Sequence, residues 1–163
     1  MSERRAGEKI AELSVTPDKY VPHRYAGASG DFNPIHIDPE FAKMVGLPGS
    51  ILHGLYVMGL VAKAVAQDIG DGDPRSLKEL SVQFRGMSFP EQEIIVSGKV
   101  TSAEGDEVQV DLIATQGENA VIRNATAALN TTTCATKAQD RRGRRGRPDL
   151  RRPTRGQCSP SDR

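Results

Sequence analysis

Residues 50–69 form the longest apolar segment of the chain, and four short segments in which apolar and polar residues alternate come after it. The apolar residues of 50–69 fall on nearly all sides of an ideal helix, which predicts a buried central helix with Ser50 as its N-cap. Alternation with a period of two predicts β-strands, with a bulge at Gly86. The alternating segments are 80–84, 96–100, 108–114 and 121–129. One central helix followed by consecutive strands predicts the α+β class, with an antiparallel sheet wrapped around the helix.

The stretch before the apolar segment is rich in turn-forming residues. Residues 8–16 are short and mixed in character, and we expect a first strand there. Thr16-Pro17 is typical of the N-cap and first position of a helix, which predicts a helix from this point to about Ala28. The glycines and prolines of 30–49 predict loop and short turns, with one short helix that follows an aspartate cap near residue 38.

Charge is distributed unevenly along the chain. Residues 1–131 carry 12 basic and 18 acidic residues, whereas residues 132–163 carry 10 basic and 3 acidic residues. The second stretch has nine arginines and one large aliphatic residue, so it cannot bury enough apolar surface to offset the entropy of ordering it. The sequence therefore predicts one folded domain over 1–131 and a disordered Arg-rich tail over 132–163.

The cysteines and the N-terminal residues restrict the class of protein and its compartment. Cys134 and Cys158 both lie in the tail, which excludes a disulfide framework or a thiolate zinc site in the folded domain. Residues 1–11 are charged and lack the apolar stretch of a secretory signal, so a cytoplasmic location is expected. Residues 49–69 are marginal in length for a membrane span and contain charged side chains, so we predict a core helix and no membrane span.

One histidine lies among carboxyl and amide groups in residues 25–38. Asp31 and His36 are five residues apart, about 140° around an ideal helix, so they meet only if the backbone folds back between them. Gly30 and Pro34 favour such a bend. An Asp beside a His can accept and donate protons around neutral pH, and Asn33 can hold the loop by hydrogen bonds to the backbone. The alternative is a turn in which Asp31 is a cap and His36 a core residue.

A second candidate feature is Leu52-His53-Gly54, near the start of the predicted apolar helix. The first N–H groups of a helix lack internal partners and favour negative charge. The N–H of Gly54 could therefore stabilise an oxyanion on a substrate carbonyl, and the absence of a side chain would allow close approach. Alternatively, the His-Gly pair serves packing, with His53 in a structural role.

The run from Tyr25 to Ala42 matches a family motif. The motif is an aromatic residue, a small residue, Gly-Asp, any residue, Asn-Pro, an aliphatic residue and His, with a small residue six positions later. Its positions are occupied here by Tyr25, Ser29, Gly30-Asp31, Asn33-Pro34, Ile35, His36 and Ala42. Over roughly residues 8–131 the sequence resembles the MaoC-like family, the (R)-specific enoyl-CoA hydratases and (3R)-hydroxyacyl-carrier-protein dehydratases. The resemblance implies a hot-dog fold, which agrees with the α+β class expected from periodicity.

The resemblance also implies roles for the candidate residues. His36 would help to remove a proton from a water that attacks C3 of a trans-2-enoyl thioester, and Asp31 would help to deliver a proton at C2; the reverse reaction is dehydration. The N–H of Gly54 would polarise the thioester carbonyl. Neither a metal nor another cofactor is implied. The residues expected to support or line the substrate site are Ser29, Asn33, Leu55, Tyr56, Met58 and Gly59.

The same residues leave other functions to consider and indicate which partners to expect. A hot-dog thioesterase usually carries a carboxylate on the central helix, and none occurs between Ser50 and Gln67. A non-catalytic subunit that binds acyl thioesters is a further alternative. The basic tail lacks interleaved aromatic residues, so nucleic acid is not expected as a partner. The expected partners are an acyl-CoA or acyl-carrier-protein thioester and a second hot-dog chain, in a homodimer or a heterodimer.

Overall fold

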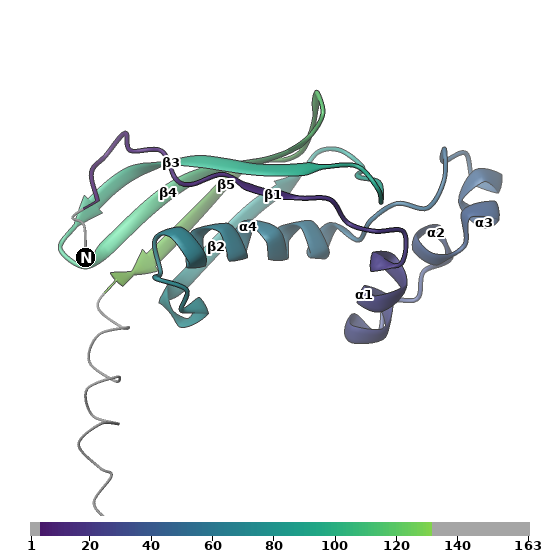
Figure 1. Cartoon of the computed structure of the whole chain (residues 1–163), viewed down its shortest axis with the longest axis horizontal. Coiled ribbons are helices and arrows are strands. Elements are labelled where there is room, and N and C mark those ends of the chain that lie inside the picture. Colours follow the sequence, from purple (N-terminus) through teal and green to yellow (C-terminus); the bar gives the residue numbers. More distant parts are fainter. Residues whose placement is uncertain (1–3, 132–163) are drawn as a thin grey trace, which may run out of the picture.

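The computed structural model describes residues 4–131, so the predicted tail lies outside the described residues. The elements, in chain order, are β1 (Leu13–Val15), α1 (Val21–Ser29), α2 (Pro34–Ile37), α3 (Pro39–Met44), α4 (Gly54–Asp68), a 3₁₀ turn (Pro74–Ser76), β2 (Leu77–Phe84), β3 (Ile94–Glu104), β4 (Glu107–Gln116) and β5 (Asn119–Asn130). Figure 1 shows α4 along one face of the sheet, with α1, α2 and α3 gathered beyond one end of it.

The five strands form one antiparallel sheet in the order β1-β3-β4-β5-β2. Apolar residues of neighbouring strands face each other across the ladder, as Val96 does with Ala114 and Val100 with Val110. The sheet packs against α4, which confirms the predicted α+β hot-dog class and the four predicted strands after the helix. The first strand is shorter than the segment 8–16 in which it was expected.

The core lies between the sheet and one side of α4. Val57, Val61 and Val65 are four residues apart on the helix and fully buried, each contributing about 1.5–3 kcal/mol relative to an exposed side chain. The expectation that α4 is buried on nearly all sides is wrong for this chain, because a single sheet covers only part of a helix. After its first residue, the exposed positions of α4 are also four residues apart: Leu55, Gly59, Lys63 and Gln67. Among residues 4–131, no helix is both long and apolar enough to cross a membrane.

The central helix begins later than predicted. Ser50 is not its N-cap, because the following residues are held by bonds outside the helix: Ile51 N–H donates to the Ile35 carbonyl (3.2 Å) and Leu52 N–H to the Ser88 carbonyl (2.8 Å). The helix therefore begins at Gly54, with His53 in an extended N-cap conformation (φ −63°, ψ 133°). The first bond attaches the segment before α4 to α2, and the second attaches it to the loop between β2 and β3.

The helices before α4 also differ from the prediction. Thr16 does not cap α1, which begins at Val21, and Asp18 instead accepts from the Tyr20 N–H in a preceding turn (2.8 Å). Residues 34–37, predicted as loop, form the short helix α2, because Asn33 is an N-cap and Pro34 suits the first helical position. The helix over 39–44 is confirmed, and Asp38 caps it.

Gly86, where a bulge was predicted, lies just beyond β2, which ends at Phe84, and the register shifts within the β2–β5 ladder fall earlier, between Leu77 and Glu79 and between Ser81 and Gln83. The N–H groups of Arg85 and Gly86 both donate to the Val121 carbonyl, at 2.9 and 3.3 Å, so two residues oppose one. Gly86 also has no room for a side chain, because a Cβ there would contact the side chain of Asn119 and the carbonyl of Ala120.

Candidate active site

The loop between α1 and α2 folds back on itself through local hydrogen bonds. Gly30 ends α1 in the left-handed conformation (φ 78°), where a residue without a Cβ is favoured. Ser29 Oγ donates to the Tyr25 carbonyl (2.8 Å) and accepts from the Asp31 N–H (3.2 Å). The Asn33 N–H donates to Asp31 Oδ1 (3.2 Å), and Asn33 Oδ1 accepts from the Ile35 N–H (3.3 Å). Predicted site residues Ser29 and Asn33 thus use their side chains to shape this loop.

The fold brings Asp31 and His36 together. Asp31 Oδ2 lies 4.0 Å from His36 Nε2, and the Asp31 side chain is half exposed whereas the His36 side chain is 11% exposed. His36 Nδ1 is 2.9 Å from the Ile51 carbonyl. Because a carbonyl only accepts, Nδ1 carries the hydrogen and Nε2 presents a lone pair toward the carboxyl group. The bend predicted from Gly30 and Pro34 therefore produces an acid beside an imidazole base.

A second histidine completes the cluster. His53 is 2% exposed, and its Nε2 lies 3.0 Å from the backbone carbonyl of Asp31 and 3.8 Å from Asp31 Oδ2. Its ring stacks on that of His36, with centroids 3.8 Å apart and planes 25° apart, and it also contacts Tyr25 at 4.8 Å. The sequence did not reveal this contact, since the only signal was the position of His53 next to Gly54.

Three potential metal ligands meet in this cluster. One ligand atom from each of Asp31, His36 and His53 lies within 4.8 Å of the other two. His53 Nε2 is already hydrogen-bonded to a carbonyl and therefore carries a hydrogen. A metal ion would have to displace this hydrogen, so the arrangement is better suited to proton transfer than to ligation.

Gly54 lies at the N-terminus of α4, directly after His53. Its N–H has no acceptor within the helix and none elsewhere in residues 4–131. A Cβ at this position would lie 3.2 Å from the ring of Phe84, so glycine leaves space between the helix start and β2. Phe84 is 49% exposed. It was not predicted as a site residue, because it lies at the far end of β2 and no local sequence pattern connects it to Gly54.

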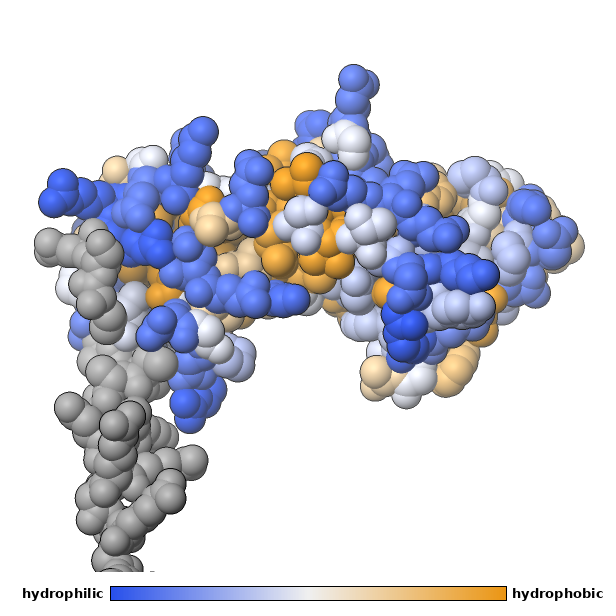
Figure 2. All heavy atoms as spheres, in the orientation of Figure 1, coloured by the Kyte–Doolittle hydropathy of each residue, from blue (hydrophilic) through white to orange (hydrophobic). Residues whose placement is uncertain are grey.

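Of the four predicted substrate-site residues on α4, two are exposed and two are half-buried. Leu55 is 60% exposed, and Gly59 is exposed with nothing near its Cβ position. Tyr56 and Met58 are half-buried against the core, and the Tyr56 ring meets Tyr25 edge-to-face at 5.9 Å. Burial raises the pKa of the Tyr56 phenol above its ordinary value, so Tyr56 remains neutral at physiological pH. Figure 2 shows apolar residues gathered at the middle of the visible face, where α4 and β1 lie in Figure 1.

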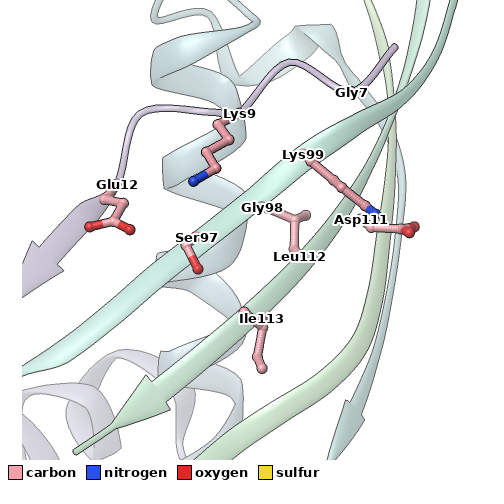
Figure 3. A pocket seen from close by; sticks show the side chains of 9 residues that line it. All are labelled: Gly7, Lys9, Glu12, Ser97, Gly98, Lys99, Asp111, Leu112 and Ile113. Carbon is pink, nitrogen blue, oxygen red and sulfur yellow. The ribbon is translucent and has the colours of Figure 1, made fainter.

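A separate hollow lies beside the N-terminal segment of the described chain. It has a volume of about 400 Å³ and lies between that segment and strands β3 and β4, as Figure 3 shows. Lys9, Glu12, Lys99 and Asp111 bring charges of both signs to its lining. It shares no residue with the Asp31 cluster, so the candidate site and this hollow are distinct.

Comparison with known proteins decides the family. Residues 3–123 match the family model described as a MaoC like domain. The chain belongs to the MaoC-like dehydratase family. It is 46% identical over 86 residues to the peroxisomal enoyl-CoA hydratase 2 of Arabidopsis thaliana, which covers 53% of this chain and 27% of that protein. It is 30% identical over 118 residues to the enoyl-CoA hydratase ChsH3 of Mycobacterium tuberculosis, which covers 72% of this chain and 39% of that protein.

Solved structures agree on the fold of this MaoC-like chain. The (R)-hydratase from A. caviae involved in PHA biosynthesis superposes with a TM-score of 0.72 at 22% identity, over 80% of this chain and 98% of that one. One chain of the ChsH1-ChsH2 complex from Mycobacterium tuberculosis gives a TM-score of 0.68 at 22% identity, over 77% and 96% of the two chains. At this identity the likeness concerns the hot-dog fold, and the chain spans well under half of the two curated relatives named above.

Proposed function

We propose that this MaoC-like chain adds water to trans-2-enoyl thioesters to give (R)-3-hydroxyacyl thioesters, and catalyses the reverse dehydration. The observation that carries the proposal is the 4.0 Å separation of Asp31 Oδ2 and His36 Nε2. This distance is too long for a direct hydrogen bond but allows one water to bond to both groups. The similarity to enoyl-CoA hydratases supports the same reaction.

The proposed chemistry balances within this pair of residues. His36 Nε2 takes a proton from the shared water as the water oxygen forms the bond to C3. This proton passes from His36 to Asp31, which delivers it to C2. Both side chains are then back in their starting states, and dehydration runs through the same steps in reverse.

The start of α4 supplies the third part of the mechanism. Attack at C3 places negative charge on the thioester oxygen, and the unpaired Gly54 N–H at the positive end of the helix dipole can stabilise that charge. His53 joins the helix start to the Asp31 loop, so the proposed oxyanion donor and the acid–base pair belong to one connected site.

The proposed function is tested by following the loss of enoyl absorbance when the purified chain is given crotonyl-CoA. Loss of absorbance with formation of the (R)-3-hydroxy product is expected. Release of free CoA without hydration would instead indicate a thioesterase, and absence of both reactions with CoA and carrier-protein substrates would overturn the proposal. Parallel assays of the two thioester forms identify which carrier the chain accepts.

We expect Gly54→Pro and Gly54→Ala to differ strongly in activity. Proline is tolerated at the first helical position, and His53 already has the extended conformation that a residue before proline prefers, so α4 should form in both variants. Both substitutions add a Cβ near Phe84, but only proline removes the N–H. Loss of the oxyanion donor predicts a kcat about 10²–10³-fold lower for Gly54→Pro than for Gly54→Ala. Equal steady-state rates would exclude this N–H from catalysis.

We also propose a second hot-dog chain as partner, of the same or a related sequence. The exposed large apolar side chains of Phe32, Leu55, Phe84 and Met87 support this proposal. The ChsH1-ChsH2 complex, one chain of which shares this fold, supports it as well. Light scattering on the purified chain, alone and with a candidate partner, should give the mass of a dimer. A single-chain mass under both conditions would count against it.

A further inference from the structure

His53 is a buried titratable group that the acid–base chemistry above does not use. It occupies the N-cap position of α4, yet its side chain makes no capping hydrogen bond to the helix. Instead it reaches back across the sequence to the carbonyl of Asp31, 22 residues earlier. A polar side chain that is 2% exposed and does not serve its own helix requires another explanation.

The hydrogen bonds of His53 determine its tautomer. Because the Asp31 carbonyl is an acceptor, His53 Nε2 carries the hydrogen. His53 Nδ1 is buried and has no hydrogen-bond partner, so a second hydrogen on that atom would be buried without an acceptor. The surroundings therefore favour the tautomer with its hydrogen on Nε2. His36 has the opposite tautomer, with its hydrogen on Nδ1, and the two rings stack.

The hydrogen bond from His53 also attaches the loop between α1 and α2 to a distant part of the chain. The other hydrogen bonds of Asp31 and Asn33 in the described chain all close within residues 29–36. Among residues 4–131, the hydrogen bond from His53 to the Asp31 carbonyl is the one that links Asp31 and Asn33 to a distant element, the start of α4. Because the His53 ring also packs against His36, one side chain touches both members of the acid–base pair.

We propose that His53 is a positioning residue, which sets the separation of Asp31 and His36 by anchoring the Asp31 carbonyl through Nε2–H and by packing its ring on His36. This inference rests on the proposed function for its catalytic consequence. His53 transfers no proton to substrate, and its contribution is to hold the acid, the base and the Gly54 N–H in fixed relation. A displacement of about 1 Å in such a group can lower the rate by roughly 10²-fold.

The test compares two replacement side chains of similar length, of which only one has a hydrogen-bond donor. His53→Gln retains an amide N–H that can reach the Asp31 carbonyl, whereas His53→Met fills similar space without a donor. We expect His53→Met to lower kcat about 10–100-fold with KM within about twofold of the wild type. His53→Gln should recover activity to within about threefold of the wild type and keep the shape of the pH–rate profile.

Two further measurements separate positioning from a structural or acid–base role. If His53 only stabilised the fold, activity would fall in step with the melting temperature in both variants. If it transferred protons, Gln and Met would be equally impaired, and either result overturns the proposal. In an Asp31→Asn background, His53→Met should cause a smaller further loss of activity than it causes in the wild type, because part of its effect acts through Asp31.

Hydrogen exchange of the loop gives a result that does not depend on turnover. Amides of residues 30–36 should exchange roughly fivefold faster in His53→Met than in the wild type, and His53→Gln should restore protection. Unchanged exchange in a folded His53→Met variant would refute the anchoring role even if the chain proved to be a hydratase. Faster exchange together with an inactive wild type would support the anchor and reject the proposed function.

Discussion

His36→Asn should lower kcat for crotonyl-CoA hydration about 10²–10⁴-fold, the range that a positioned general base contributes. The amide nitrogen of asparagine can occupy the place of His36 Nδ1 and keep the bond to the Ile51 carbonyl, so the local fold should be retained. What is lost is the Nε2 lone pair that faces Asp31 across 4.0 Å.

The measurement for His36 is steady-state kinetics of purified wild type and variant, with thermal unfolding as the control for folding. His23 provides a matched control, because it is an exposed histidine on α1 whose ring lies 6.5 Å from that of Tyr20, away from the Asp31 cluster. His23→Asn should leave turnover unchanged. A His36→Asn variant with near wild-type turnover would remove the imidazole from the mechanism.

Asp31→Asn should reduce kcat by a similar factor, about 10²–10⁴-fold, since the amide cannot deliver a proton to C2. Asparagine retains a side-chain oxygen that can accept from the Asn33 N–H, so the turn before α2 should persist. The carboxyl group is half exposed, which limits the effect of the substitution on stability.

Asp38→Asn is the matched control for Asp31→Asn. Asp38 accepts from the Glu40 and Phe41 N–H groups as the N-cap of α3, and asparagine caps helices about as well. The same chemical change should therefore leave activity within about twofold at position 38. If both variants lost activity equally, the effect at position 31 would be structural.

The two active-site variants should also be strongly non-additive. If Asp31 and His36 act on one water, the double variant Asp31→Asn/His36→Asn should lose little more activity than either single variant. Losses that multiply would instead indicate two independent roles. This result distinguishes a shared water from two separate proton-transfer sites.

Sequence reasoning succeeded where short-range rules decide the outcome. A period of two predicted the four strands after α4, and the turn chemistry of Gly30, Asn33 and Pro34 accounts for the bend that joins Asp31 to His36. It failed at helix starts that depend on distant partners. Ser50 has the residue type of an N-cap, but the bonds of the next two residues to Ile35 and Ser88 delay the helix to Gly54.

The sequence by itself determined the family, the α+β class and the Asp31–His36 pair, because periodicity and a compact motif act over a few neighbouring residues. Only the tertiary structure decided that His53 anchors the Asp31 carbonyl, that Phe84 lies against Gly54, and that one stripe of α4 stays exposed. The first two features join residues more than 20 positions apart, and the third depends on which side of α4 the sheet covers. They depend on how the sheet packs on the helix, and no local pattern encodes that packing.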